Sequence, residues 1–576
     1  MSKQKSTTIT STNHPDLASF YISTALMHYK TCNYPEALLS CEKALAIQQQ
    51  SLPPNHPDLA DSYNNIGLVH ADMGNYPKAL SSHEKALKIR QQSLPPNHLD
   101  LAQCHHNIGV VHFKIGNYPK ALYCFQRALE ILPQTLPSNH PDLASSYNNI
   151  GALYADMGNS PKALSYHKKA LEIQQQSLPS NHPDVAYSYN NIGAVHQDMG
   201  NYQKALSSHE KALGTQQQSL PPNHPDLVDS YNNIGLVHAD MGDSPKALSY
   251  HKKALEIQQQ SLPPNHPDLA DSYNNIGAVH QDMGDYPKAF SYYGKALETR
   301  QQSLPPNHPD LAQSYNNIGV LHVNMGNYSK ALSSQEKALE IRQQSLPPNH
   351  PDLAYSYNNI GLVHYKTCNY PEALLSCEKA LAIQQQSRPP NHPDLADSYN
   401  NIGAVHQDMG DYPKAFSYYG KALNIKQQSL PSNHPDLADS YSNIGLVHND
   451  MGNYPEALSS HEKVLKIRQQ SLPPNHRDVA LSYNNIGEVY NNMGYYPKAL
   501  YCFQRALEIL PQTLPSNHPY LAYPYNNIGL LYENMGNYSK ARTFYEHAIQ
   551  VGEKSLPSTH PELKKRRNNL ERVKNK

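Results

Sequence analysis

The chain has 576 residues, of which 38% are hydrophobic, and a net charge of −1 from 47 basic and 48 acidic residues. It contains no run of about 18 apolar residues, which excludes a membrane-spanning helix. The first eight residues include no apolar stretch, so a secretory signal peptide is not expected. A nucleic-acid partner would require an excess of basic residues, which this balance lacks. We therefore expect a cytoplasmic protein that binds no nucleic acid and no membrane.

The sequence repeats every 42 residues without insertion or deletion. The marker is Asn-His-Pro or a close variant, with its histidine at 14, 56, 98, 140, 182, 224, 266, 308, 350, 392, 434, 476, 518 and 560. A period between 20 and 50 residues indicates a solenoid, a propeller or an array. We expect a short disordered N-terminus at 1–13, thirteen repeats over 14–559 and a capping helix at 560–576.

One unit, from His56 to Asn97, contains two amphipathic patterns. Apolar residues recur every three or four positions over 59–73 and again over 76–89, the spacing of one helical face. Pro57 suits a first helical turn, and Gly74 suits the left-handed conformation that ends a helix. The second pattern stops at Leu94–Pro96. Each unit is therefore predicted to be a helix, a tight turn, a second helix and a linker.

Small residues stand where the two helices are predicted to cross, at Gly67, Ala79 and Ala86. Helix axes approach closely only where a side chain is absent or short. Neither helix buries its apolar face alone, so the units must stack on their neighbours. The fold class that follows is all-α, an α-solenoid.

This pattern resembles the tetratricopeptide repeat, which has small residues at positions 8, 20 and 27 of a 34-residue core. Here the cores are 60–93, 102–135, 144–177 and their equivalents, and core positions are counted from Ala60 and its counterparts. The 42-residue spacing, the His-Pro-Asp-Leu-Ala entry and the Asn-Asn pair are similar to the repeats of kinesin light chains. The resemblance implies a right-handed superhelix whose concave face, lined by the first helices, binds protein segments. The heptad region with which kinesin light chains bind their motor has no counterpart in Met1–Asn13.

Core position 6 is the main candidate for a peptide-binding groove. It is asparagine in every unit after the first, and an amide both donates and accepts hydrogen bonds, as an extended backbone requires. The resemblance implies that this asparagine binds ligand backbone; the alternative is an amide ladder that only fixes stacking. The residues are Asn65, Asn107, Asn149, Asn191, Asn233, Asn275, Asn317, Asn359, Asn401, Asn443, Asn485 and Asn527.

Two further positions on the same predicted face are often acidic. Position 13 is lysine at 30, 114 and 366 but aspartate at 72, 156, 198, 240, 282, 408 and 450. Position 2 is aspartate at 61, 229, 271, 397 and 439. This favours a protein partner with an extended, neutral or basic segment; the alternative is ordinary solvated surface charge.

No cofactor, metal or catalytic site is expected. The one local cluster of metal-ligand types, Cys104-His105-His106 with His112, lacks the spacing of a zinc site. The linker histidines have no local partners in the sequence. Near-identical units also disfavour catalysis, which needs unlike residues at one point.

The final segment repeats only the first helix of a unit, and its many charges are expected to face solvent as a cap. Segments 118–141 and 496–519 are identical, which indicates duplication within the array. We interpret the chain as a non-catalytic protein-interaction scaffold. A cargo adaptor like the kinesin light chains and a regulatory arm of a larger enzyme remain alternatives.

Overall fold

The computed structural model describes residues 15–574 and 576, so the segment 1–13 that we expected to be disordered lies outside the described residues. Within that range the regular structure is entirely helical. The first helices of the units are α1 (Pro15–Lys30), α3 (Pro57–Asp72), α5 (Leu99–Lys114), α7 (Pro141–Asp156), α9 (Pro183–Asp198), α11 (Leu227–Asp240), α13 (Asp268–Asp282), α15 (Pro309–Asn324), α17 (Pro351–Lys366), α19 (Pro393–Asp408), α21 (Pro435–Asp450), α23 (Arg477–Asn492) and α25 (Ala522–Asn534).

The second helices alternate with them, and a single helix follows the last pair. They are α2 (Tyr34–Ser51), α4 (Tyr76–Ser93), α6 (Tyr118–Ile131), α8 (Ser160–Ser177), α10 (Tyr202–Gln217), α12 (Ser244–Ser261), α14 (Tyr286–Ser303), α16 (Tyr328–Ser345), α18 (Tyr370–Ser387), α20 (Tyr412–Ser429), α22 (Tyr454–Ser471), α24 (Tyr496–Ile509) and α26 (Tyr538–Glu553), and the final helix is α27 (Pro561–Lys574). Short 3₁₀ helices lie at Leu132–Gln134, Leu510–Gln512 and Pro519–Leu521.

The linker histidine caps the first helix of its unit, a role that the sequence analysis did not assign to it. In the second unit the backbone N–H of Asp58 donates to Nδ1 of His56 at 3.2 Å. Pro57 is the first helical residue and needs no hydrogen bond at its nitrogen. Gly74, in the turn between α3 and α4, has a φ of 71°, which is the left-handed conformation expected at the end of a helix. The repeated Asn-His-Pro therefore acts as a helix start signal.

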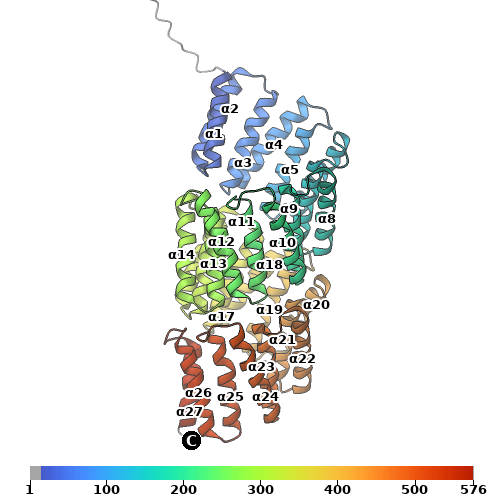
Figure 1. Ribbon diagram of the computed structural model, residues 1–576. Helices are drawn as coiled ribbons and strands as arrows, with labels where there is room; N and C mark the ends of the chain where they lie inside the picture. Colours follow the sequence, from blue (N-terminus) through green and yellow to red (C-terminus); the bar gives the residue numbers. More distant parts are fainter. Residues whose placement is uncertain (1–14, 575) are drawn as a thin grey trace, which may run out of the picture.

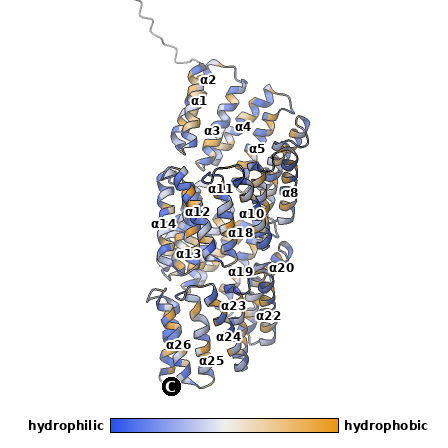
Figure 2. Cartoon of the chain, in the orientation of Figure 1, coloured by the Kyte–Doolittle hydropathy of each residue, from blue (hydrophilic) through white to orange (hydrophobic). Residues whose placement is uncertain are grey.

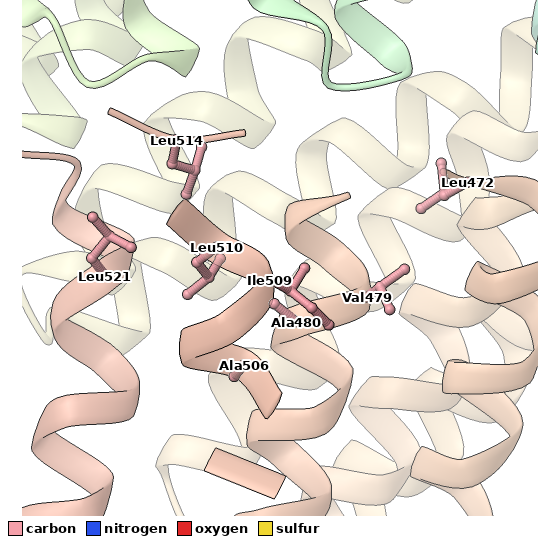
Figure 3. Packing of buried hydrophobic residues seen from close by; sticks show 8 residues of the cluster. All are labelled: Leu472, Val479, Ala480, Ala506, Ile509, Leu510, Leu514 and Leu521. Carbon is pink, nitrogen blue, oxygen red and sulfur yellow. The ribbon is translucent and has the colours of Figure 1, made fainter. Parts of the chain in front are cut away.

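The small residues pack as predicted, because Gly67 is buried and Ala79 and Ala86 are fully buried. Linker leucines extend this packing from one unit to the next. Figure 3 shows one such cluster near the C-terminal end, where residues from two linkers, two α-helices and two 3₁₀ helices meet: Leu472, Val479, Ala480, Ala506, Ile509, Leu510, Leu514 and Leu521. The hydrophobic core is therefore a chain of similar clusters along the array.

The inner side of the curve is formed by the first helices. Those of neighbouring units touch directly, as α7 does with α9 and α17 with α19, whereas the second helices are held further apart. The helices run roughly along the long axis of the molecule, and the chain forms three tiers from blue to red (Figure 1). Apolar and polar segments alternate along the helices (Figure 2). No helix between residues 15 and 574 has the length and apolarity needed to cross a membrane.

Successive turns of the superhelix contact each other directly. Nε2 of the linker histidine lies 2.9–3.0 Å from a carbonyl oxygen at the end of a first helix 236 residues earlier, and the pairs are His308 with Asp72, His350 with Lys114, His392 with Asp156, His434 with Asp198 and His518 with Asp282. Because Nδ1 accepts the capping N–H, Nε2 carries the proton and donates. In these five pairs a unit bonds to the sixth unit after it.

Apolar contacts accompany these bonds between turns. Tyr76 packs in one cluster with Leu346, from the linker that precedes the ninth unit. A Cβ on Gly74 would lie 2.8 Å from Cδ of Pro309, so glycine is also required there for the close approach of the next turn. The wall of the superhelix is therefore continuous from one tier to the next.

Buried histidines at core position 24 connect the two helices of five units. Burial lowers the pKa of each to about 4, and they are His83, His167, His209, His251 and His461. Nδ1 of His251 lies 3.0 Å from Oδ1 of Asn232, and its Nε2 has no hydrogen-bond partner in the described part of the chain. A proton on that nitrogen would bring an uncompensated charge into the core.

We therefore expect stability to fall with pH below about 6.5. The unfolded chain takes up protons near 6.5, while the folded chain resists them until about 4, so this contribution is complete above 6.5 and is lost as pH falls toward 4. The lowered pKa of each histidine corresponds to a loss of roughly 3 kcal/mol in the free energy of unfolding by pH 4. Burial also raises the pKa of several carboxylates, among them Asp198, to about 6, and Asp229 and Asp240, and these groups contribute in the opposite direction. Urea denaturation at pH 7 and 4.5 measures the difference.

Glutamine at these five positions provides the control, because Gln335 already occupies position 24 in the eighth unit and is buried. The five-fold His→Gln variant should remain helical and lose most of this pH dependence. An unchanged pH profile would show that other groups control acid unfolding.

The C-terminal cap departs from our prediction of a fully solvated helix. Arg566, on α27, is only 2% exposed. A Cβ on Gly552 would lie 2.7 Å from Nη1 of Arg566, so the arginine fills the space that this glycine leaves. Lys564 and Lys565 beside it are exposed as expected.

Candidate functional site

The candidate site is the concave face formed by the first helices. On α3 the four residues at positions 2, 6, 9 and 13 are Asp61, Asn65, Leu68 and Asp72, and each is exposed or half-buried. Residues between them, such as Ile66, are buried and pack against α2, the second helix of the preceding unit. The spacing of four, three and four residues thus places these side chains on one accessible stripe.

The asparagines of position 6 fall into two groups. Five donate to a side chain at position 5 of the preceding unit, at 2.6–3.4 Å: Asn107 to Asn64, Asn149 to His106, Asn359 to Asn316, Asn485 to Ser442 and Asn527 to Asn484. The Oδ1 atom of Asn317 accepts from Gln313. An amide ladder therefore exists, but only over part of the array.

The other six amides make no side-chain hydrogen bond in the part of the chain that the structure describes. They are half-buried on the concave face, with donors and acceptors that remain open to a ligand: Asn65, Asn191, Asn233, Asn275, Asn401 and Asn443. Three of them, Asn191, Asn233 and Asn275, lie on consecutive first helices. The predicted groove thus contains two kinds of asparagine: those whose amides bond to another side chain, and those whose amides are available to a ligand.

Carboxylates of position 13 form a stripe beside these amides. Asp156, Asp198 and Asp240 lie on consecutive helices, and burial followed by the charges of Asp240 and Asp156 raises the pKa of Asp198 to about 6. Asp240 accepts from Nε2 of Gln197 at 2.6 Å. Asp156 is paired with Arg388 at 3.1 Å from the next turn. Among the described residues, no basic side chain lies within ion-pair distance of Asp198 or Asp240.

The aspartates at position 2 contribute less negative charge to the concave face than the sequence of the first helices suggests. Its aspartates pair at 2.5–3.1 Å with a buried cation at position 31 of the same unit: Asp61 with Arg90, Asp271 with Arg300, Asp397 with Lys426 and Asp439 with Arg468. Sequence reasoning missed these pairs because it considered the first helix alone. The signal was present, since aspartate at position 2 occurs with arginine or lysine 29 residues later in these four units.

Two units break this pairing. Asp229 has Gln258 at position 31 instead of a cation, and burial raises the pKa of Asp229. Arg342 has Gln313 at position 2, and burial lowers the pKa of Arg342. Asp229 therefore adds a further unpaired carboxylate near the middle of the concave face.

The histidine and cysteine cluster is used for packing. Cys104 accepts from Nη1 of Arg90 at 3.3 Å, and the ring of His106 lies 5.9 Å from that of Phe125. Among the described residues, no three side chains of the metal-ligating types are grouped to hold an ion.

Comparison with family models decides the assignment. The model described as tetratricopeptide repeat matches residues 16–92, 58–134, 142–218, 184–260, 226–302, 268–344, 310–386, 352–428, 394–470, 436–512 and 478–554. The chain belongs to the tetratricopeptide repeat family. No curated protein sequence matches it significantly. Members of this family are generally scaffolds for protein interactions.

Solved structures similar to this tetratricopeptide repeat chain include three repeat proteins. BtubC (BKLC) from P. vanneervenii is 24% identical over 39% of this chain and 91% of its own, with a TM-score of 0.34. A Podosopora anserina protein with nearly identical TPR-like repeats, named after kinesin light chains, is 22% identical over 36% and 98%, with a TM-score of 0.32. The APC/C hetero-tetramer Cut9-Hcn1 gives 16% identity over 97% and 96%, with a TM-score of 0.41.

Proposed function

We propose that this protein is a non-catalytic scaffold that holds an extended, basic segment of a partner protein along its concave face. The observation that carries the proposal is the joint presence of available amides and unpaired carboxylates on consecutive first helices. Asn191 and Asn233 lie about two helical turns before Asp198 and Asp240 on the same helices, α9 and α11. Amides pair with peptide backbone, and carboxylates pair with lysine or arginine side chains.

The charges on the concave face support a basic rather than a neutral segment. Burial, followed by the charges of Asp240 and Asp156, raises the pKa of Asp198 to about 6, as expected for carboxylates that lie near one another on this face. A bound lysine or arginine would relieve that repulsion. Because a single backbone hydrogen bond contributes only about 0.5–1.5 kcal/mol, tight binding requires several units together.

A peptide-display selection on the whole chain tests the proposal. Wild type should enrich peptides rich in lysine and arginine, and their affinity should fall with added salt. The variant Asp198→Asn with Asp240→Asn should weaken binding by about 100-fold or more, since each of the two charge-assisted hydrogen bonds contributes about 1.5–3 kcal/mol. Replacing Asn191, Asn233 and Asn275 by alanine should weaken all peptides regardless of their charge.

Glu172→Gln with Glu256→Gln is the matched control. It removes the same charge from exposed positions on the second helices α8 and α12. Equal losses in the control and the aspartate variant would mean that net charge, and not the concave face, attracts the peptides. Enrichment of acidic peptides would refute the proposed specificity.

A further inference from the structure

Arg566 in the C-terminal cap is a buried cation without hydrogen-bond partners. Its Nε, Nη1 and Nη2 atoms make no hydrogen bond in the described part of the chain. The nearest carboxylate, that of Glu562, lies 3.9 Å away, beyond hydrogen-bond distance. Burial lowers the pKa of Arg566. Since a guanidinium remains charged in proteins, its donors require acceptors.

The equivalent place in other units shows what Arg566 lacks. Arg300, at position 31 of the seventh unit, donates at 2.9 Å to Ser314 and to the backbone carbonyl of Asp310. In the cap, Gly552 occupies the position of the arginine, and Arg566 occupies the position of the serine. The guanidinium instead lies over the ring of Tyr523, 5.2 Å from its centroid. This contact with the ring face uses none of the N–H donors of the guanidinium.

Arg566 lines a cavity of about 310 Å³ where the cap meets the preceding turn of the superhelix. Lys366, an exposed residue at the end of α17, lines the same cavity. Its ammonium group lies over the ring of Tyr365 and has no carboxylate within ion-pair distance in the described residues. The cavity therefore brings together two cations from units that are far apart in the sequence.

The remaining charges of this cavity are already largely used. Asp282 is paired with Arg477 at 3.5 Å, and Arg477 also lies 3.8 Å from Asp478. Of the other lining groups, Arg566 and Lys366 are cationic and Glu562 is anionic. The tyrosines that complete the lining contribute hydroxyl groups and ring faces: Tyr286, Tyr328, Tyr520 and Tyr523.

We infer that this cavity, the cap cavity, binds a phosphate group. A dianion with four oxygens provides acceptors for the guanidinium of Arg566 and for the ammonium of Lys366 at once, which a neutral or cationic ligand does not. Tyrosine hydroxyls add further donors around the same volume. The phosphate is either inorganic phosphate or a phosphate monoester whose organic part lies against the tyrosine rings.

Thermal unfolding of the full chain in the presence of inorganic phosphate, phenyl phosphate or chloride at equal ionic strength tests this inference. Both phosphates should raise the unfolding midpoint of the wild type above its value in chloride, because a ligand that binds only the folded state stabilises it. Tighter binding of phenyl phosphate than of inorganic phosphate, measured by calorimetry, would identify a monoester site. The reverse order would identify a site for free phosphate.

Three variants separate this site from a general effect of anions. Arg566→Met should lose the phosphate-dependent shift, and Lys366→Met, at an exposed residue, should weaken phosphate binding by about 10-fold with no change in the midpoint in chloride. Arg342→Met is the matched control, since Arg342 is also buried but does not line the cap cavity. Equal shifts in all four proteins, or no shift in the wild type, would overturn the inference.

Discussion

Asparagine in place of five of the linker histidines that bond to the preceding turn is expected to separate the turns of the superhelix. The change is made at His308, His350, His392, His434 and His518. Asparagine keeps an oxygen that caps the helix, but it does not reach the carbonyl 236 residues earlier. With about 1 kcal/mol for each lost bond, about 5 kcal/mol of stabilisation between turns is removed. Small-angle X-ray scattering should show a larger radius of gyration, while circular dichroism should show unchanged helix content.

The chain contains a matched control for this experiment. His56, His98, His140, His182 and His224 cap their helices in the same way but have no earlier turn to contact, and they are more exposed. Five asparagines at these positions should leave the radius of gyration unchanged. An equal expansion in both variants would show that capping, and not the contact between turns, holds the superhelix compact.

Acid should have the same effect as the substitution. Burial lowers the pKa of His350, His392 and His434, although the aspartate two residues after each histidine opposes the shift. These rings therefore stay neutral at pH 7, and Nδ1 remains free to accept the capping N–H. As the pH falls below the ordinary value near 6.5, protonation removes that acceptor, so the contacts between turns should weaken at acidic pH and not at alkaline pH.

The contacts between turns also bear on how a partner reaches the concave face. Because five units bond to the sixth unit after them, we expect the stacked tiers to enclose the stripe of asparagine and aspartate residues. A partner segment must enter along the superhelix axis, or the turns must separate first. The asparagine variant should therefore bind the selected basic peptides faster than the wild type, with little change in which peptides are selected.

The sequence predicted the helices and their packing because these depend on contacts within one unit or between neighbours. Pro57, Gly74 and Ala79 determine where a helix starts, where it turns and how closely it packs, and the same signals recur every 42 residues. The contacts between turns could not be predicted in this way. They depend on small rotations that accumulate over six units, and His56 and His308 look the same in the sequence although only His308 meets another turn.

Two segments of identical sequence have different surroundings in the fold. Tyr118 and Tyr496 begin the same 24-residue stretch, yet Tyr118 is 4% exposed and Tyr496 is half-buried. Tyr118 lies under Arg388 of the next turn, whereas the described chain has no turn beyond Tyr496. For the same reason, the sequence identified the asparagines at position 6 but not which of them are engaged by a neighbour.

Alanine in place of Gly235 is expected to destabilise the sixth unit by about 1–3 kcal/mol, the range measured for overpacked cores. A Cβ at this position would lie 2.7–2.9 Å from three ring atoms of His251. That ring is fully buried and bonded to Asn232, so it has no space to move. The clash should outweigh the gain of about 1 kcal/mol that alanine brings to a helix interior.

Hydrogen exchange measured over α11 and α12 is the appropriate test, because in a repeat array a local loss does not appear as one global transition. Gly294, inside α14, is the control, since a Cβ there meets no atom within 4 Å. Gly294→Ala should slow exchange locally, while Gly235→Ala should accelerate it.

Combining Gly235→Ala with His251→Ala shows whether the ring is the cause. Removing the ring leaves a cavity of its own, so His251→Ala alone should destabilise the unit. If the clash explains the first effect, adding Gly235→Ala to that background should cost nothing further, which gives a coupling free energy of 1 kcal/mol or more. If the two losses simply add, the glycine at position 8 is required by the helix backbone and not by the residue at position 24, and the same requirement would then hold for Gly277, which faces Tyr293.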